Sequence, residues 1–293
     1  MAEQVTFQSG TDRCVGYLRL SGRESGPCVV LCTGFGGTQD TSALVAAAEA
    51  FAKAGYHTLT FDYRSFGESG GHPRQVVSID GQLTDIAAAV ACARGLDSVD
   101  GDRIALWGSS LGGGHVVTAA ARDQRIAAVV AQIPFNGFPR KVQGRSTWST
   151  LRLLGVMADD WCRGFVRLRP HYIPAVGVQG ELAVMTGDGA ERAIRAMTSE
   201  TWRNEVAPRG LIEMMRYRPG DFAAQLECPL LVCVGTEDAE TTPESAGALA
   251  RAAPLGELLE YPVAHFDFYS ADVRDRVIAD QLAFLRRTLA RKD

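Results

Sequence analysis

The stretch Ile104-Ala105-Leu106-Trp107-Gly108-Ser109-Ser110-Leu111-Gly112 decides the fold of this 293-residue chain. Its first four residues are apolar and predict a buried strand, while residues 111–121 have the apolar spacing of a helix. The five residues between them match G-x-S-x-G, a sharp strand-to-helix turn that exposes a serine. The motif is short, so its position between a strand and a helix is what makes it informative.

The glycine spacing decides which of the two adjacent serines is the candidate nucleophile. The turn accepts only small residues two positions before and two positions after the nucleophile. Ser110 has Gly108 and Gly112 at these positions, whereas bulky side chains stand there for Ser109. We therefore predict Ser110 as the nucleophile. The alternative is a Gly/Ser-rich turn with no catalytic role.

Strands and helices alternate along most of the chain. The predicted strands cover residues 4–8, 13–20, 27–32, 58–61, 103–107, 126–133, 229–234 and 258–263. Predicted helices lie between the later ones, and several strands are continuous apolar runs, typical of strands buried on both faces. This pattern predicts an α/β fold: a mostly parallel eight-stranded sheet with helices on both faces.

The alternation stops between residues 139 and 220, where we see helix-like pieces and no clear strand. We predict that residues 1–138 and 221–293 form the core domain, and that residues 139–220 form a helical cap, or lid, over the site. The cap has 13 Arg and Lys residues against 8 Asp and Glu. Its first half is the most basic part, with Arg140, Lys141, Arg145, Arg163, Arg167 and Arg169.

This composition has two interpretations. The functional one is an apolar pocket with a basic mouth, in which Trp148 and Trp161 contact a substrate with an anionic tail or carrier. The other is a solvated helical face whose aromatic residues pack onto the core.

A serine hydroxyl needs a base to become a nucleophile. In a sheet of this kind, ligands gather at the carboxyl ends of the strands. Among the five histidines, His265 is the one that follows a predicted strand and keeps the chain order Ser, Asp, His. His57 precedes a strand, His115 lies on the helix after the serine, and His72 and His171 lie in a loop and in the cap.

The acid of the triad should follow the strand at residues 229–234, where it can accept the Nδ1–H of the base and fix its tautomer. We predict Asp238 for this role. Glu237 is the next candidate, and Asp221 and Asp267 are weaker ones.

The developing oxyanion needs backbone donors. We expect one from the Leu111 amide and the other from the Phe35 amide, in the stretch Thr33-Gly34-Phe35-Gly36-Gly37. Gly34 and Gly36 are the alternative donors and would let the loop approach the substrate closely. The alternative is that these glycines only make the turn.

These stretches, together with residues 61–69 (FDYRSFGES) and 265–269 (HFDFY), resemble the α/β-hydrolase superfamily. Within it they are similar to the X-prolyl dipeptidyl-peptidase-like and dienelactone-hydrolase-like hydrolases. The resemblance implies a Ser, Asp, His triad without a cofactor. The pattern D-x-R-x-x-G-x-S at Asp62, Arg64, Gly67 and Ser69 implies a structural turn beside the oxyanion loop.

Two departures from this group matter. Thr33-Gly34 replaces the common His-Gly entry to the oxyanion loop, and Ser110 replaces the cysteine nucleophile of dienelactone hydrolases. The second departure disfavours lactonase chemistry of that kind.

Composition bounds the remaining properties. With a net charge of −4 and scattered basic residues, we expect no nucleic-acid partner. No long apolar run or secretion signal is visible, so we expect no membrane partner and a cytoplasmic protein. Seven cysteines without a CxxC pair predict small buried hydrophobes in a reducing compartment and no metal site.

We therefore predict a serine hydrolase that cleaves a small-molecule ester or thioester. An acyltransferase or a small-amide or peptide hydrolase would share every motif, and a catalytically dead binding protein is a further alternative. The sequence leaves the oligomeric state open, with a homodimer as a candidate.

Overall fold

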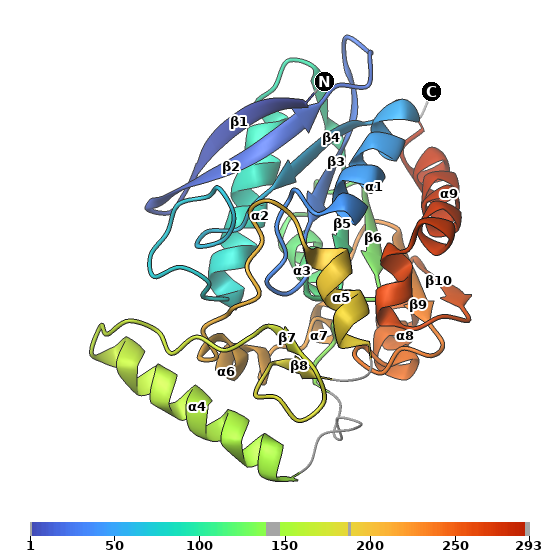
Figure 1. The fold of residues 1–293 in the computed structure, drawn as a ribbon. Helices are drawn as coiled ribbons and strands as arrows, with labels where there is room; N and C mark the ends of the chain where they lie inside the picture. Colours follow the sequence, from blue (N-terminus) through green and yellow to red (C-terminus); the bar gives the residue numbers. More distant parts are fainter. Residues whose placement is uncertain (1, 139–146, 187–188, 291–293) are drawn as a thin grey trace.

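An eight-stranded sheet forms the centre of the computed structural model, which describes residues 2–138, 147–186 and 189–290 (Figure 1). The strand order is β1-β2-β4-β3-β5-β6-β9-β10. Only β2 pairs antiparallel, with β1 and β4, and the other neighbours in this sheet are parallel. The predicted fold class is confirmed. The strands are β1 (Ala2–Ser9), β2 (Asp12–Arg19), β3 (Gly26–Cys32), β4 (His57–Phe61), β5 (Val99–Ser109), β6 (Ala128–Gln132), β9 (Leu230–Gly235) and β10 (Gly256–Tyr261).

Helices cover both faces of the sheet because successive strand residues point to opposite sides. In β3, Val29 packs with α1 (Ser42–Lys53) and α9 (Ala271–Thr288). Its neighbour Val30 packs on the other side, with α2 (Ile79–Arg94), α3 (Leu111–Arg122) and α8 (Pro243–Ala252). The continuous apolar runs of the sequence therefore belong to strands buried on both faces.

The segment between β6 and β9 combines helices, two short strands and long connecting stretches in its described part. It contains α4 (Thr147–Phe165), β7 (Val176–Gly177), β8 (Met185–Thr186), α5 (Ala190–Met197), α6 (Gly210–Met214) and α7 (Gly220–Ala223). The two short strands β7 and β8 pair in parallel, which the sequence analysis did not predict. The division into core and cap at residues 139 and 220 stays a prediction.

Polar contacts attach this segment to the residues just after β3. Asp40 accepts hydrogen bonds from the Ser199 hydroxyl (2.7 Å), and from the Thr201 amide and hydroxyl (both 2.9 Å). Burial raises the pKa of Asp40, but a hydrogen bond from the Thr38 hydroxyl together with those from Ser199 and Thr201 outweighs it, and the pKa lies below its ordinary value. The α5 region is thereby held beside α1 and the predicted oxyanion loop.

Candidate active site

Ser110 lies in the sharp turn between β5 and α3. Its backbone has φ 55° and ψ −119°, in the region that non-glycine residues rarely adopt. A Cβ atom at Gly108 would lie 2.2 Å from the Gly112 carbonyl oxygen, and one at Gly112 would lie 2.3 Å from the Thr33 oxygen. The structure therefore gives the physical reason for both glycines, and the turn presents Ser110 at the carboxyl end of the sheet.

His265 and Asp238 form a buried pair at the ends of the neighbouring strands β10 and β9. Because a carboxylate only accepts, His265 donates its Nδ1–H to Asp238 Oδ2, at 2.7 Å. The His265 side chain is 4% exposed and that of Asp238 is fully buried. His265 is the first residue of the 3₁₀ helix η1 (His265–Tyr269). Its Nε2 is thereby left as the nitrogen that can face a nucleophile.

Four interactions hold the Asp238 carboxylate. Oδ1 accepts the Glu240 and Thr241 amides, both at 2.8 Å. Oδ2 accepts the Thr241 hydroxyl at 2.9 Å in addition to His265. Burial raises the pKa of Asp238, but the charge and hydrogen bond of His265, together with Thr241, bring it below its ordinary value. The carboxylate stays ionised and fixes the orientation of the imidazole.

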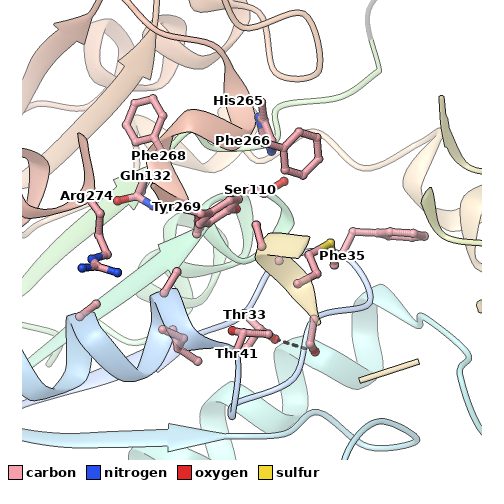
Figure 2. Close-up of a pocket in the computed structure, with 18 of the residues that line it drawn as sticks. Thr33, Phe35, Thr41, Ser110, Gln132, His265, Phe266, Phe268, Tyr269 and Arg274 are labelled. Carbon is pink, nitrogen blue, oxygen red and sulfur yellow. Dashed lines mark hydrogen bonds between the residues drawn. The ribbon is translucent and has the colours of Figure 1, made fainter. Parts of the chain in front are cut away.

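The predicted nucleophile, base and acid meet at one edge of the sheet. Ser110 and His265 line the same two cavities. Figure 2 shows the Ser110 hydroxyl pointing toward the His265 ring. With Asp238 behind His265, the arrangement has the connectivity of a Ser, His, Asp triad.

The weaker acid candidates lie elsewhere. Glu237 and Asp221 are exposed. Asp267 accepts the Ala264 amide at 3.0 Å and pairs with Arg192.

Three of the other described histidines have structural contacts, and the fourth, His72, is exposed in a loop. His57 accepts the Ser21 amide at 3.1 Å, and His171 bonds Asp159 at 2.9 Å. His115 lies between Tyr217 and Gln82, and burial lowers its pKa to about 3. It therefore stays neutral.

The predicted oxyanion donors lie beside the nucleophile. Leu111 is the first residue of α3, so its amide has no partner within the helix. On the other side, a Cβ atom at Gly34 would lie 3.1 Å from the Ser110 Cβ, which places the loop backbone against the nucleophile. Phe35 and Leu111 line the larger cavity and Gly34 the smaller one, whereas Gly36 lines neither.

The motif at residues 62–69 supports this loop. Asp62 accepts the Gln39 amide at 2.8 Å, just after the loop, and the Glu68 amide at 2.9 Å. Burial raises the pKa of Asp62 to about 6. Ser69 donates to the Asp62 carbonyl at 2.6 Å, and a Cβ at Gly67 would overlap the Asp62 carboxylate. The contacts of the motif at residues 62–69 are those of a structural turn.

Two cavities meet at Ser110 and His265. The larger has a volume of about 230 Å³ and is lined mainly by apolar side chains of α4, α6 and the β8 region. These are Leu153, Leu154, Met157, Val184, Met185, Leu211, Met214 and Met215. The smaller, of about 60 Å³, lies between α1, α9 and η1 (Figure 2). Its lining includes Phe266, Tyr269 and Arg274.

The prediction that Trp148 and Trp161 contact substrate is not supported by this geometry. Both lie on α4, line neither cavity and are 70% and 55% exposed. The inner face of α4 carries Leu153 and Met157 instead, because a helix turns its successive residues to different sides.

The geometry of the described residues does not support the predicted basic mouth either. Arg163, Arg167 and Arg169 line neither cavity. Arg140, Lys141 and Arg145 lie outside the described residues. Among the described Lys and Arg residues, Arg274 of α9 is the one that lines either of these two cavities, and it bonds Asp275 at 3.0 Å. Nothing in the sequence alone distinguished it from other basic residues of that helix.

The sequence analysis also missed a buried polar network next to Ser110. The Tyr269 hydroxyl bonds the Ser109 hydroxyl at 3.0 Å, and Gln132 donates to Ser109 at 3.2 Å. Gln281 donates to Gln132 at 3.0 Å and accepts the Trp107 indole N–H at 2.9 Å. The network joins the helix that carries His265 to β5, the strand that ends just before Ser110.

The seven cysteines are all free. The four in apolar runs, Cys28, Cys32, Cys228 and Cys233, are buried as predicted, whereas Cys162 is exposed. Burial raises the pKa of the Cys28, Cys32 and Cys233 thiols to about 12. Among the described residues, no group of three or more His, Cys, Asp or Glu side chains is placed to hold a metal ion.

The fold and the arrangement of the site define the class of this protein as an α/β hydrolase. The family profile described as "Serine aminopeptidase, S33" (Hydrolase_4) matches residues 24–265. The chain belongs to this family, so the resemblance to the superfamily is confirmed.

Three known proteins are informative comparisons. The chain is 36% identical to the quorum-quenching protein AidA of Acinetobacter baumannii, over 97% of this chain and 94% of that protein. It is 29% identical to the polyketide transferase ATR5 of Stachybotrys chlorohalonatus, over 94% and 93%. The solved structure of DcsB with its substrate analogue has a TM-score of 0.85 at 23% identity, covering 99% of this chain and 100% of that one, and shares the fold.

These findings support a hydrolase or acyltransferase-type activity.

No helix in the described part of the chain has the length and apolar character needed to cross a bilayer.

Proposed function

We propose that this protein is a serine hydrolase that cleaves a small-molecule ester or thioester through an acyl-enzyme on Ser110. The observation that carries the proposal is the buried 2.7 Å hydrogen bond from His265 to Asp238 at a cavity that Ser110 also lines. That bond places the proton on Nδ1, so Nε2 is unprotonated and faces Ser110 as a base.

The reaction has two halves. Ser110 Oγ attacks the carbonyl carbon while His265 Nε2 takes the hydroxyl proton, and Asp238 stabilises the resulting imidazolium. The Phe35 and Leu111 amides bind the oxyanion. The intermediate collapses as His265 returns the proton to the leaving alcohol or thiol. Water, deprotonated by His265, then attacks the acyl-enzyme, and the acid leaves with Ser110 restored.

The two cavities suggest how the substrate is divided. The larger cavity is apolar and begins at Phe35 and Leu111, so we assign it to an apolar acyl group. The smaller cavity offers polar groups and the Arg274 guanidinium, so it suits the leaving group or an anionic tail. A small acyl compound, with or without an anionic tail or carrier, is thus the proposed substrate.

Acyl transfer is the second candidate, favoured by the likeness to a named polyketide transferase over 94% of this chain. In that reaction an alcohol or amine replaces water in the second half. Cleavage of a small amide or peptide would use the same groups. A catalytically dead binding protein is disfavoured because all three triad positions are filled and His265 is hydrogen-bonded to Asp238.

The test is an activity panel of esters, thioesters and amides with acyl chains of increasing length, with and without alcohol and amine acceptors. Ser110→Ala should abolish turnover. Ser109→Ala, the adjacent serine, is the matched control and should keep most of it. Equal activity in wild-type protein and Ser110→Ala would overturn the proposal, and acyl products on added acceptors would favour the transferase.

A further inference from the structure

Helix α4 carries an apolar stripe on its outer face. Leu151, Leu154, Ala158, Trp161 and Phe165 follow one another at alternating steps of three and four residues, which keeps them on one side of a helix. All five are exposed, and the fractions reach 55% for Trp161 and 82% for Phe165. Large apolar side chains exposed in a row mark an interaction surface.

The stripe is not the face by which α4 attaches to the rest of the chain. That attachment uses Leu153, Met157 and Asp160, the buried residues of the helix. Asp160 bonds the Arg209 guanidinium at 2.8 Å and the His171 amide at 2.8 Å. The inner face is therefore fully used, while the outer face is left with no covering among the described residues.

We propose that a second copy of this chain covers the stripe, with the two α4 helices packed antiparallel about Ala158. Alternating steps of three and four residues form the seam of paired helices. Ala158 lies at the centre of the stripe, where a small side chain lets two helix axes come close. Gly155, whose outer side is open, and Cys162 lie beside the seam. The antiparallel arrangement also places opposite helix-dipole ends together.

The exposed area is sufficient for such a contact. Aromatic side chains bury about 150–250 Å² each, so Trp161 and Phe165 of the stripe, with Trp148 beside it, together still have about 400 Å² to bury. This is half of the ~800 Å² per partner in a standard interface. Leu151 and Leu154, 56% and 43% exposed, add to it.

Pairing at this surface would also affect the larger cavity. Leu154 belongs to the stripe and lines the cavity. Phe138 and Met215 line it too and are 39% and 49% exposed, so these three side chains form its rim. A second copy on the stripe covers part of this rim and shields the cavity from water.

Sedimentation velocity on the full chain tests the proposal over a range of concentrations. Wild-type protein should sediment as a dimer, at twice the 31.5 kDa chain mass. Trp161→Glu and Leu151→Glu should each sediment as monomers. The matched control is Leu255→Glu, a leucine 54% exposed between α8 and β10, which should stay dimeric. Circular dichroism should show unchanged folding in all three, because each side chain is exposed.

Cross-linking through Cys162 tests whether the two α4 helices are antiparallel. In the antiparallel pair the two Cys162 Cα atoms lie about 12 Å apart along the axis, beyond the ~7 Å limit for a disulfide. A long bismaleimide should therefore give a covalent dimer, lost in Cys162→Ser, whereas mild oxidation should not. A monomer at every concentration, dimers that survive both glutamate substitutions, or a monomer that cosediments with phosphatidylglycerol vesicles would each overturn the proposal.

Discussion

Replacing Asp238 with asparagine removes a charge from the site without changing its shape. Asp238 Oδ1 accepts two backbone amides at 2.8 Å, so this position must remain an oxygen in the variant. The asparagine nitrogen then stands where Oδ2 is now, 2.7 Å from His265 Nδ1. It donates to Nδ1 and forces the proton onto Nε2, the tautomer that cannot accept a proton from Ser110.

The expected loss follows from this tautomer change. The same substitution in a well-studied serine protease triad lowers kcat by about 10⁴, or about 5 kcal/mol of transition-state stabilisation. We expect a similar fall in kcat for Asp238→Asn, with KM nearly unchanged because Asp238 does not touch the substrate. The Thr241 hydroxyl loses Oδ2 as an acceptor in the variant but can still donate to the Ile133 carbonyl oxygen, 3.1 Å away, so local order is kept.

The assay is steady-state hydrolysis of a chromogenic ester of the acyl length that the wild-type protein prefers. Glu237→Gln is the matched control, since it removes a neighbouring exposed carboxylate and should leave kcat within about twofold. An Asp238→Asn protein that is folded and keeps more than a tenth of wild-type kcat would refute the reasoning. A loss in Glu237→Gln instead would move the acid to that residue.

Three further predictions follow from the same contacts. Leu153→Trp should fill the apolar cavity, so that kcat/KM falls at least tenfold for long-chain esters and stays nearly constant for acetyl esters; an equal fall for both would contradict the assignment of this cavity. Asp160→Asn should cost about 3 kcal/mol of unfolding free energy at pH 7, because it leaves the Arg209 guanidinium without its charged partner. Burial raises the pKa of Asp160, but Arg209 lowers it overall, so this stabilisation is present above the unfolded pKa of about 3.9 and is lost as pH falls. Urea unfolding should therefore show the two proteins converging below pH 4, and a constant difference would be contrary evidence. Tyr269→Phe removes one hydrogen bond to Ser109, and a bond of about 1 kcal/mol predicts a free energy of unfolding lower by that amount, with kcat within about twofold of wild type as for Ser109→Ala; a large fall in kcat with an unchanged free energy of unfolding would argue against a structural role.

The core of the fold was predictable because its signals are local. Continuous apolar runs at residues 27–32 and 229–234 are typical of strands buried on both faces, and β3 and β9 are indeed entirely buried. The triad was predictable for a related reason. Parallel strands end at one edge of the sheet, so Ser110, Asp238 and His265, each just after a strand, are brought to the same edge.

The cap was harder to predict because its helix α4 carries apolar side chains on both its inner and its outer face. The aromatic residues of α4 suggested a pocket, but Trp148 and Trp161 lie on its outer face and Leu153 on its inner one. Packing with distant segments decides which apolar face of a helix lies against the core. The periodicity of the sequence identifies both apolar faces but does not choose between them.

The network through Ser109 and Tyr269 escaped prediction for a similar reason. Its members lie on four different elements, and each residue alone has an ordinary polar side chain. Tyr269, four residues after His265, carried the one available signal, its place in the stretch that resembles the family.

Intact-protein mass spectrometry with a fluorophosphonate tests the central claim most directly, because this reagent reacts preferentially with an activated serine. The account predicts one adduct per chain, mapped to the peptide that contains Ser110, and none in Ser110→Ala or after prior incubation with a slowly turned-over ester. Labelling that persists in Ser110→Ala, or an unlabelled wild-type protein that still hydrolyses esters, would contradict it.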